Sequence, residues 1–135
     1  MVDENCLADL KQSCEYIKNK LEGFHNGLVY DTQMDDMVDM DTMVERGNGY
    51  YNTERFLDVE SYLSNNHGVT ITKNIGYDDN EFNSCCITMV TGGPGIYINT
   101  ETEMIEGRWW GTNCDVPISH AICLMVERAI ISLYM

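Results

Sequence analysis

The sequence predicts an α+β fold in which an antiparallel meander of about four strands lies between N-terminal helices and a C-terminal helix. Near the start and the end of the chain, apolar residues recur every three or four positions, which is the period of an amphipathic helix. Between these segments the period changes to two, as a half-buried strand requires, and short turn-rich links separate the strands. Helices at both ends of such a sheet are expected to pack on one of its faces.

The first helix is predicted between Asn5 and Leu21, and Gly23 and Asn26-Gly27 follow as breaking signals. A second, short helix is predicted after Thr53, whose hydroxyl suits an N-cap. It would carry the apolar residues Phe56, Val59, Tyr62 and Leu63 and end at the turn residues 64–68.

The first strand is predicted where Val69, Ile71 and Ile75 alternate with polar residues, before a turn at 76–83. Three further strands are expected at 84–91, 96–100 and 104–111, with short links that favour an antiparallel meander. A helix over 119–134, capped by Ser119, completes the chain.

The length of 135 residues and the apolar content of 44% suit one compact unit with a real core. We therefore expect a single domain over 1–135. It consists of a helical, acidic part at 1–66 and a second part at 67–135 that holds the sheet and the C-terminal helix.

The charge is strongly acidic, with 22 acidic residues against 8 basic ones and a formal net charge of -14. Direct binding of nucleic acid is unfavourable for such a chain, because phosphates would be repelled. A partner of this protein should therefore be basic.

The chain has no apolar run long enough to cross a membrane and no apolar leader at its start, so we expect a cytoplasmic protein without a membrane partner. Its six cysteines contain no C-x-x-C pair. We expect all six to be free thiols that serve mainly as small buried hydrophobic residues.

Residues 31–45 carry six carboxylates and no Lys or Arg, with methionines three residues apart. Read as a helix, the segment places Asp31, Asp35 and Asp39 on one ridge, at a cost of roughly 0.2–0.5 kcal/mol for each pair of like charges four apart. Because lysines usually relieve such repulsion, we expect the ridge to face a basic partner rather than only solvent. The predicted contact residues are Asp31, Asp35, Asp36, Asp39, Asp41 and Glu45. The alternative is a face that is acidic for solubility alone.

Trp109 and Trp110 are adjacent on a predicted strand, so their side chains should point to opposite faces. Trp110 shares its face with Arg108 and Glu106. If that mixed face lies in solvent, Arg108 and Trp110 form a second candidate contact for a partner protein. If a helix covers the face, Trp110 is an ordinary core residue.

No pattern in the chain predicts catalysis, a cofactor or a metal. The calcium-loop template fails from Asp39, and the glycines at 92–95 lack both phosphate-loop patterns. No histidine has a spacing to a cysteine or serine that indicates a nucleophilic site. An alternative reading remains, in which Gly92–Gly95 and Trp110 belong to a small ligand-binding or enzymatic domain.

The segment from Ile87 to Ser119 resembles small acidic proteins that phages and other bacterial mobile elements carry, on a G-G-P turn, a short strand, a W-W-G sequence and a P-I-S helix start. The resemblance implies a bacterial host cytoplasm and an inhibitor of host defence, such as an anti-CRISPR or anti-restriction protein. Together with the acidic ridge, it predicts a non-enzymatic inhibitor of a basic defence nuclease or effector complex. The remaining alternative is an acidic accessory protein that does not mimic nucleic acid.

Overall fold

The computed structural model describes residues 4–49, 53–73 and 82–135. They form a mixed α+β fold with two antiparallel sheets, which confirms the predicted fold class. The larger sheet has five strands in the order β4-β5-β6-β7-β8, and the smaller has three in the order β2-β1-β3.

The larger sheet is a meander, because each strand pairs antiparallel with the next one along the chain. Its last strand, β8, was not expected from the sequence. Of the first predicted strand and turn, Ile75 and residues 76–81 lie outside the described residues. The strands are β4 Gly68–Lys73, β5 Phe82–Val90, β6 Gly95–Asn99, β7 Met104–Trp109 and β8 Thr112–Pro117.

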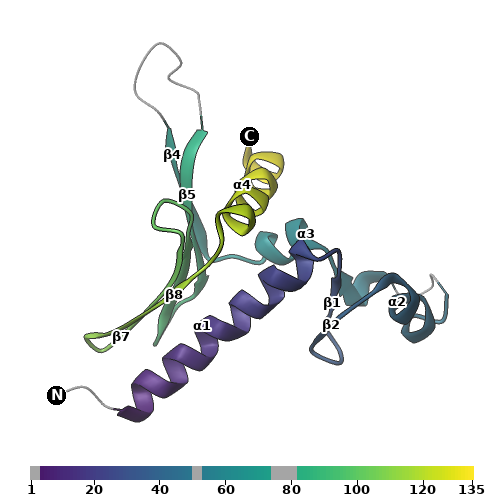
Figure 1. Cartoon of the computed structure of the whole chain (residues 1–135), viewed down its shortest axis with the longest axis horizontal. Helices are drawn as coiled ribbons and strands as arrows, with labels where there is room; N and C mark the ends of the chain where they lie inside the picture. Colours follow the sequence, from purple (N-terminus) through teal and green to yellow (C-terminus); the bar gives the residue numbers. More distant parts are fainter. Residues whose placement is uncertain (1–3, 50–52, 74–81) are drawn as a thin grey trace.

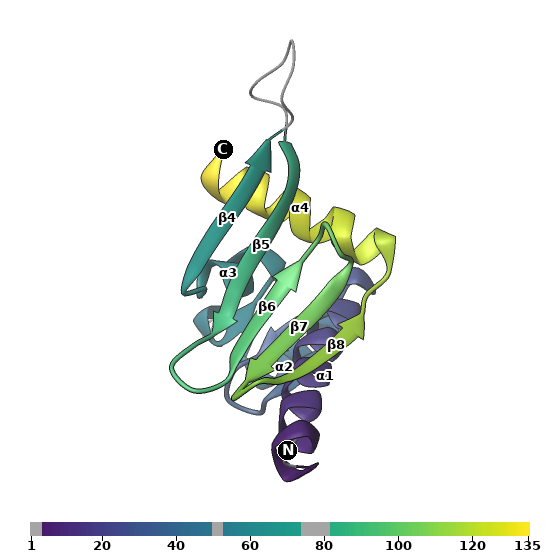
Figure 2. The same ribbon diagram turned by 90° about the vertical axis from the view of Figure 1, so that its left-hand side faces the viewer.

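The helices cover one face of this sheet, as Figure 2 shows with the sheet in front. They are α1 Glu4–His25, α3 Val59–Ser64 and α4 His120–Tyr134. The predicted cap of α4 is confirmed, since the backbone N–H of Ile122 donates to the Ser119 side chain. Among the helices that the structure describes, none has the length and apolar run needed to cross a bilayer.

The predicted cap of the second short helix is wrong. Thr53 starts a 3-10 turn that ends at Arg55, and the helix α3 is capped instead by Asp58, which accepts a hydrogen bond from the N–H of Ser61. Between them, β3 Phe56–Leu57 pairs with β1, so the chain is extended where the sequence pattern predicted a helix. Pairing with a neighbouring strand has overridden the local helical period.

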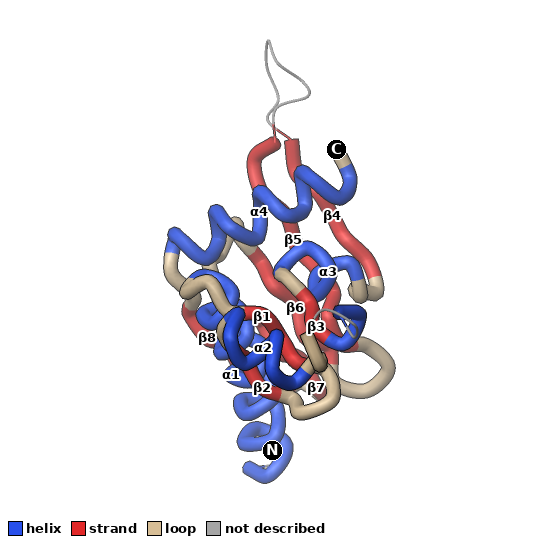
Figure 3. The backbone as a smooth tube through the Cα atoms, turned by 90° about the vertical axis from the view of Figure 1, so that its right-hand side faces the viewer, coloured by secondary structure: helices blue, strands red, loops and turns tan. Residues whose placement is uncertain are grey.

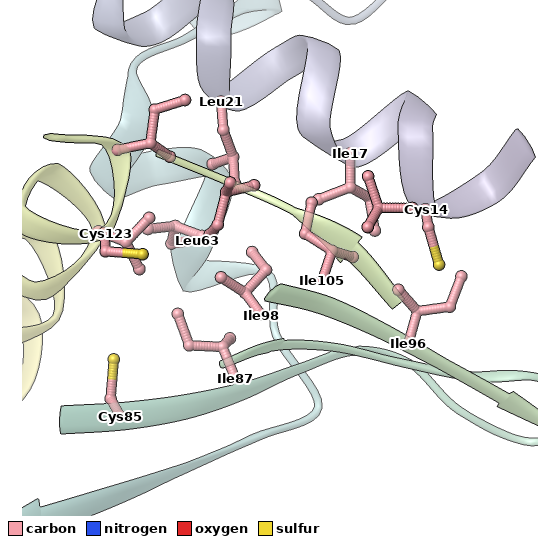
Figure 4. Close-up of a cluster of buried hydrophobic side chains, with 14 of the residues drawn as sticks. Cys14, Ile17, Leu21, Leu63, Cys85, Ile87, Ile96, Ile98, Ile105 and Cys123 are labelled. Atoms are coloured by element: carbon pink, nitrogen blue, oxygen red, sulfur yellow. The ribbon is translucent and has the colours of Figure 1, made fainter. Parts of the chain in front are cut away.

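The core lies between the five-stranded sheet and the helices (Figure 4). Alternate strand residues point into it, and Ile87, Ile98 and Ile105 are almost completely buried. The six cysteines are free thiols, as expected, and Cys14 and Cys85 belong to the core. Burial raises the pKa of the Cys14 thiol to about 12 and that of Cys85 to about 11, so both thiols stay protonated and behave as apolar groups at neutral pH.

Helix α1 packs closely on the sheet at Gly107, on β7. A Cβ atom at this position would lie 2.8 Å from both the Cys14 Sγ and the Leu10 Cγ. Both of these side chains are buried, so they have little room to move away. The glycine therefore sets the distance at which the helix packs on the sheet.

The smaller sheet and a short helix form a lobe that lies beyond the C-terminal end of α1, away from the larger sheet (Figure 1). Its elements are β1 Val29–Asp31, β2 Asp36–Val38, α2 Met40–Arg46 and β3 Phe56–Leu57. Figure 3 shows α2 in front of these strands. We call residues 29–49 and 53–57 the acidic lobe.

The prediction of one helix over residues 31–45 is wrong. The chain forms a β-hairpin between β1 and β2, and a helix begins only after Asp39. The methionine spacing of three imitates a helical period, but Asp31 stabilises a turn instead, by accepting hydrogen bonds from the N–H groups of Gln33 and Met34. The expected ridge of Asp31, Asp35 and Asp39 therefore does not form.

Replacing Gly107 with alanine should destabilise the fold by about 1–3 kcal/mol, because the new methyl group overpacks the contact with α1. The free energy of unfolding in urea measures this. Gly93→Ala is the matched control, since a Cβ at Gly93 meets nothing within 4 Å and the backbone there is not left-handed. Equal stability of the two variants would contradict the close packing of α1 on β7.

Candidate functional site

Asp31 is the only carboxylate found buried among the described residues, with 0% of its surface exposed. The Arg55 guanidinium holds both of its oxygens in a fork, with Nε 2.8 Å from Oδ1 and Nη2 2.7 Å from Oδ2. Arg46 Nη1 donates to Oδ2 as well, at 3.1 Å. Two arginines and two backbone N–H groups thus compensate one buried charge.

The two arginines of the acidic lobe are turned inward by this carboxylate. The Arg55 side chain is only 12% exposed, and Arg46 also pairs with Asp36 at 2.8 Å. The hydrogen bonds from Arg55 are the main cause that holds the pKa of the Asp31 carboxyl well below its usual range; those from Arg46 add to them, while burial opposes. Both guanidinium charges are therefore neutralised by carboxylates of the lobe itself.

Asp35 connects the acidic lobe to α1. The hydroxyls of Tyr16 and Tyr30 both donate to its Oδ1, the latter at 2.5 Å, and Lys20 Nζ lies 3.5 Å from the same atom. The hydrogen bonds from the two tyrosine hydroxyls lower the pKa of the Asp35 carboxyl, and the bond from Tyr16 contributes most. The Lys20 ammonium also lies 3.1 Å from the ring centroid of Tyr16 and 4.4 Å from that of Tyr30, so it is almost enclosed by aromatic rings.

The outer surface of the acidic lobe carries Asp39, Asp41, Glu45 and Glu54, all exposed. Asp39 caps α2 by accepting a hydrogen bond from the N–H of Thr42, which lowers its pKa. The other three form no ion pair with any described residue of the chain. This surface therefore presents negative charge that no basic side chain of the lobe offsets.

The structure brings the predicted acidic residues together in one lobe, but in three different roles. Asp31 is buried and out of reach of a partner, whereas Asp35 and Asp36 are exposed yet engaged in internal pairs. Asp41 and Glu45 remain free to contact another molecule. A partner-binding role for these residues stays a prediction.

Arg108 and Trp110 lie apart from the lobe, on the five-stranded sheet. Arg108 is on the outer face and pairs with Asp115 on β8, with Nη1 2.7 Å from Oδ1. The prediction that Trp110 lies on a strand is wrong. Strand β7 ends at Trp109, and Trp110 forms a two-residue turn with Gly111. Both turn residues have positive φ, 51° and 79°, as a type I′ hairpin turn requires. Trp110 is 89% exposed, as expected if it does not belong to the core.

A hollow of about 540 Å³ lies between α1, β1, α3 and the ends of β5 and β6. Val90 and Ile96, which flank the glycines at 92–95, belong to its lining. Trp110 does not line it. A hollow therefore lies beside the glycine-rich junction, and the alternative of a ligand-binding domain that uses Gly92–Gly95 and Trp110 stays a prediction.

Sequence reasoning missed four residues of this region: Lys20, Arg46, Arg55 and Glu54. A signal for two of them exists, because Arg46 and Arg55 are the only Lys or Arg residues between Lys20 and Lys73. Isolated basic residues in a long acidic segment favour internal pairing. Within residues 4–49, 53–73 and 82–135, no three side chains of His, Cys, Asp or Glu are grouped as a metal site would need.

Comparisons with known protein families, curated proteins and solved structures found no match to this chain. Only the geometry and the charge of the candidate site therefore indicate what it can bind.

Replacing Asp31 with asparagine should destabilise the protein by about 3 kcal/mol, because both arginines lose the buried charge that compensates them. Urea unfolding, followed by circular dichroism, measures the change. Asp41→Asn removes one carboxylate from the exposed surface of the same lobe and should change stability by no more than about 0.5 kcal/mol. Similar losses in both variants would contradict the structural role of Asp31.

The contribution of Asp31 should depend on pH in a defined direction. Its pKa in the folded protein lies below the value of about 4 in an unfolded chain, so its stabilisation is complete above that value and is lost as the pH falls through the folded pKa. The difference in unfolding free energy between wild type and Asp31→Asn should be constant from pH 7 to about pH 5 and shrink at lower pH. A difference that grows on acidification would refute this assignment.

Proposed function

We propose that this protein is a non-enzymatic, acidic inhibitor that binds a basic, nucleic-acid-handling protein of a bacterial host, such as a nuclease or effector complex of a defence system. The acidic lobe is its contact surface, and Asp39, Asp41, Glu45 and Glu54 are the leading contact residues. The observation that carries the proposal is the pairing of Arg46 and Arg55 with Asp31 and Asp36, which leaves the other exposed carboxylates of the lobe, Asp39, Asp41, Glu45 and Glu54, without a basic partner in the described part of the chain.

The charge of the acidic lobe supports this proposal. Residues 29–57 hold seven acidic and two basic residues, a net charge of -5 (2 - 7). Both basic residues lie against Asp31, so the outward field of the lobe is negative. Such a field attracts a groove lined with Lys and Arg and accelerates association with it.

The rigidity of the lobe also favours binding over a purely solubilising role. Its charges are carried on a paired hairpin and a capped helix, and Asp35 fastens the hairpin to α1 through Tyr16 and Lys20. A binding surface fixed in advance loses little conformational entropy when a partner binds. A lobe that served only to keep the protein in solution would not need to be rigid.

The resemblance of residues 87–119 to small acidic proteins of phages and mobile elements is a second line of support. It concerns the five-stranded sheet and the start of α4, and not the acidic lobe. It bears on the setting of the protein, a bacterial cell with defence systems, whereas the charge of the lobe indicates the contact surface.

A charge-matched pair of variants tests the proposal. Variant L carries Asp41→Asn, Glu45→Gln and Glu54→Gln in the lobe; variant C carries Asp9→Asn, Glu15→Gln and Glu101→Gln, at exposed sites elsewhere. Both change the net charge from -14 to -11. Immobilised wild type should retain host nucleic-acid-binding proteins at low salt, and nucleic acid should displace them. Variant L should associate with the retained protein about tenfold more slowly, and variant C should behave like the wild type.

Equal binding by variants L and C would show that only net charge matters, and the protein would then be an acidic accessory protein without mimicry of nucleic acid. Retention that persists in about 1 M salt would also contradict the proposal, since exposed charge pairs are screened within about 3 Å there. Thermal unfolding of both variants controls for the fold, because none of the six side chains forms an ion pair with another described residue.

A further inference from the structure

From its lining and its fixed aromatic walls, we infer that the hollow between α1, β1, α3 and the ends of β5 and β6 is a binding site for an uncharged small molecule with an aromatic or other apolar body. This site is distinct from the acidic lobe surface, and the inference does not rest on the function proposed above. With a volume of about 540 Å³ the hollow falls within the range of roughly 300–1,000 Å³ that is typical of small-molecule sites.

The walls of the hollow are apolar and come from separate parts of the chain. Ile17 lies on α1, while Met89, Val90 and Ile96 come from the neighbouring strands β5 and β6. Tyr62 on α3 closes another side. No charged side chain belongs to the lining, so a ligand here exchanges water for apolar contact.

The aromatic walls are held in place by bonds that do not involve a ligand. Tyr16 and Tyr30 both donate to Asp35, and the ring of Tyr30 meets that of Tyr62 edge to face, with centroids 6.1 Å apart. Phe24 supports Tyr62 from the core at 5.4 Å. Because the rings are already fixed, a ligand loses little affinity to ordering them. The side chain of Tyr16 is 44% exposed, so the wall can be reached from solvent.

The charge distribution selects an uncharged ligand. An anion would be repelled by a protein with a net charge of -14. A cation would find the rings of Tyr16 and Tyr30 already in contact with the Lys20 ammonium, which removes most of their attraction for a second positive charge.

The rim of the hollow offers hydrogen bonds that can orient a ligand. Gln12 and Ser13 lie on the exposed side of α1 and make no side-chain hydrogen bond within the described part of the chain, and Asn65 donates to Ser61 while its carbonyl oxygen can still accept. A ligand with one or two neutral polar groups next to its apolar body therefore suits this site.

Two fluorescent probes that differ by one charged group test the inference. N-phenyl-1-naphthylamine is uncharged, and 8-anilino-1-naphthalenesulfonate is the same aromatic body with a sulfonate. The uncharged probe should bind the folded protein saturably and raise its melting temperature, while the sulfonate should bind about tenfold more weakly or worse. Absence of saturable binding of the uncharged probe, or equal binding of the sulfonate, would overturn the inference.

A pair of tryptophan variants locates the site. Ser13→Trp places a bulky side chain from α1 into the hollow and should weaken binding of the uncharged probe by about tenfold or more. Asn19→Trp adds the same side chain to an exposed position of α1 outside the lining and should leave binding unchanged. Both positions are exposed, so both variants should fold, and circular dichroism checks this. Unchanged binding in Ser13→Trp would place the probe elsewhere and refute the assignment.

Discussion

The acidic lobe depends on one interaction, the pairing of the buried Asp31 carboxylate with Arg55 and Arg46. A buried carboxylate destabilises a fold unless opposite charges and hydrogen bonds compensate it. Here the compensating guanidinium groups come from Arg46 at the end of α2 and from Arg55 in the turn before β3. The carboxylate thereby joins three segments that share little apolar core of their own. The same bonds also shape the surface, because Arg55 is held at Asp31 and Arg46 is held between Asp31 and Asp36, so neither arginine pairs with Asp39, Asp41, Glu45 or Glu54. Internal order and external charge thus have a single cause.

A second set of contacts fixes the lobe to the rest of the molecule. Met37 on β2 packs against Gly23, where a Cβ would lie 2.8 Å from the methionine Cε, and Tyr30 reaches Tyr62 on α3. Tyr16 and Lys20 on α1 hold Asp35. The lobe therefore has a defined orientation relative to α1, and the hollow exists because the lobe and the large sheet are held on either side of the same aromatic cluster.

The elements with a clean apolar period could be predicted from sequence, and those set by distant polar contacts could not. Helices α1 and α4 and strands β5 to β7 follow the pattern of their own residues. Strand β8 was not predicted because only Val116 among its inward residues is a large apolar residue, the others being Thr112 and Cys114, and because its outward residues are typical of turns. The hairpin at 29–38 was not predicted, because the methionine spacing imitates a helical period. The arginine partners of Asp31 lie 15 and 24 residues further along the chain. No local pattern can show a pairing over that distance.

The contact of α1 with the last strand of the sheet has a consequence for synthesis. Cys14 on α1 faces the carbonyl of Cys114 on β8, 100 residues later in the chain. At roughly 5–20 residues per second, a ribosome needs about 5–20 s to extend the chain from one to the other. Until β7 and β8 have been made, the part of the helix that packs on them has no cover, so the nascent chain exposes apolar surface that chaperones recognise. The fold can close only when its C-terminal third has left the ribosome.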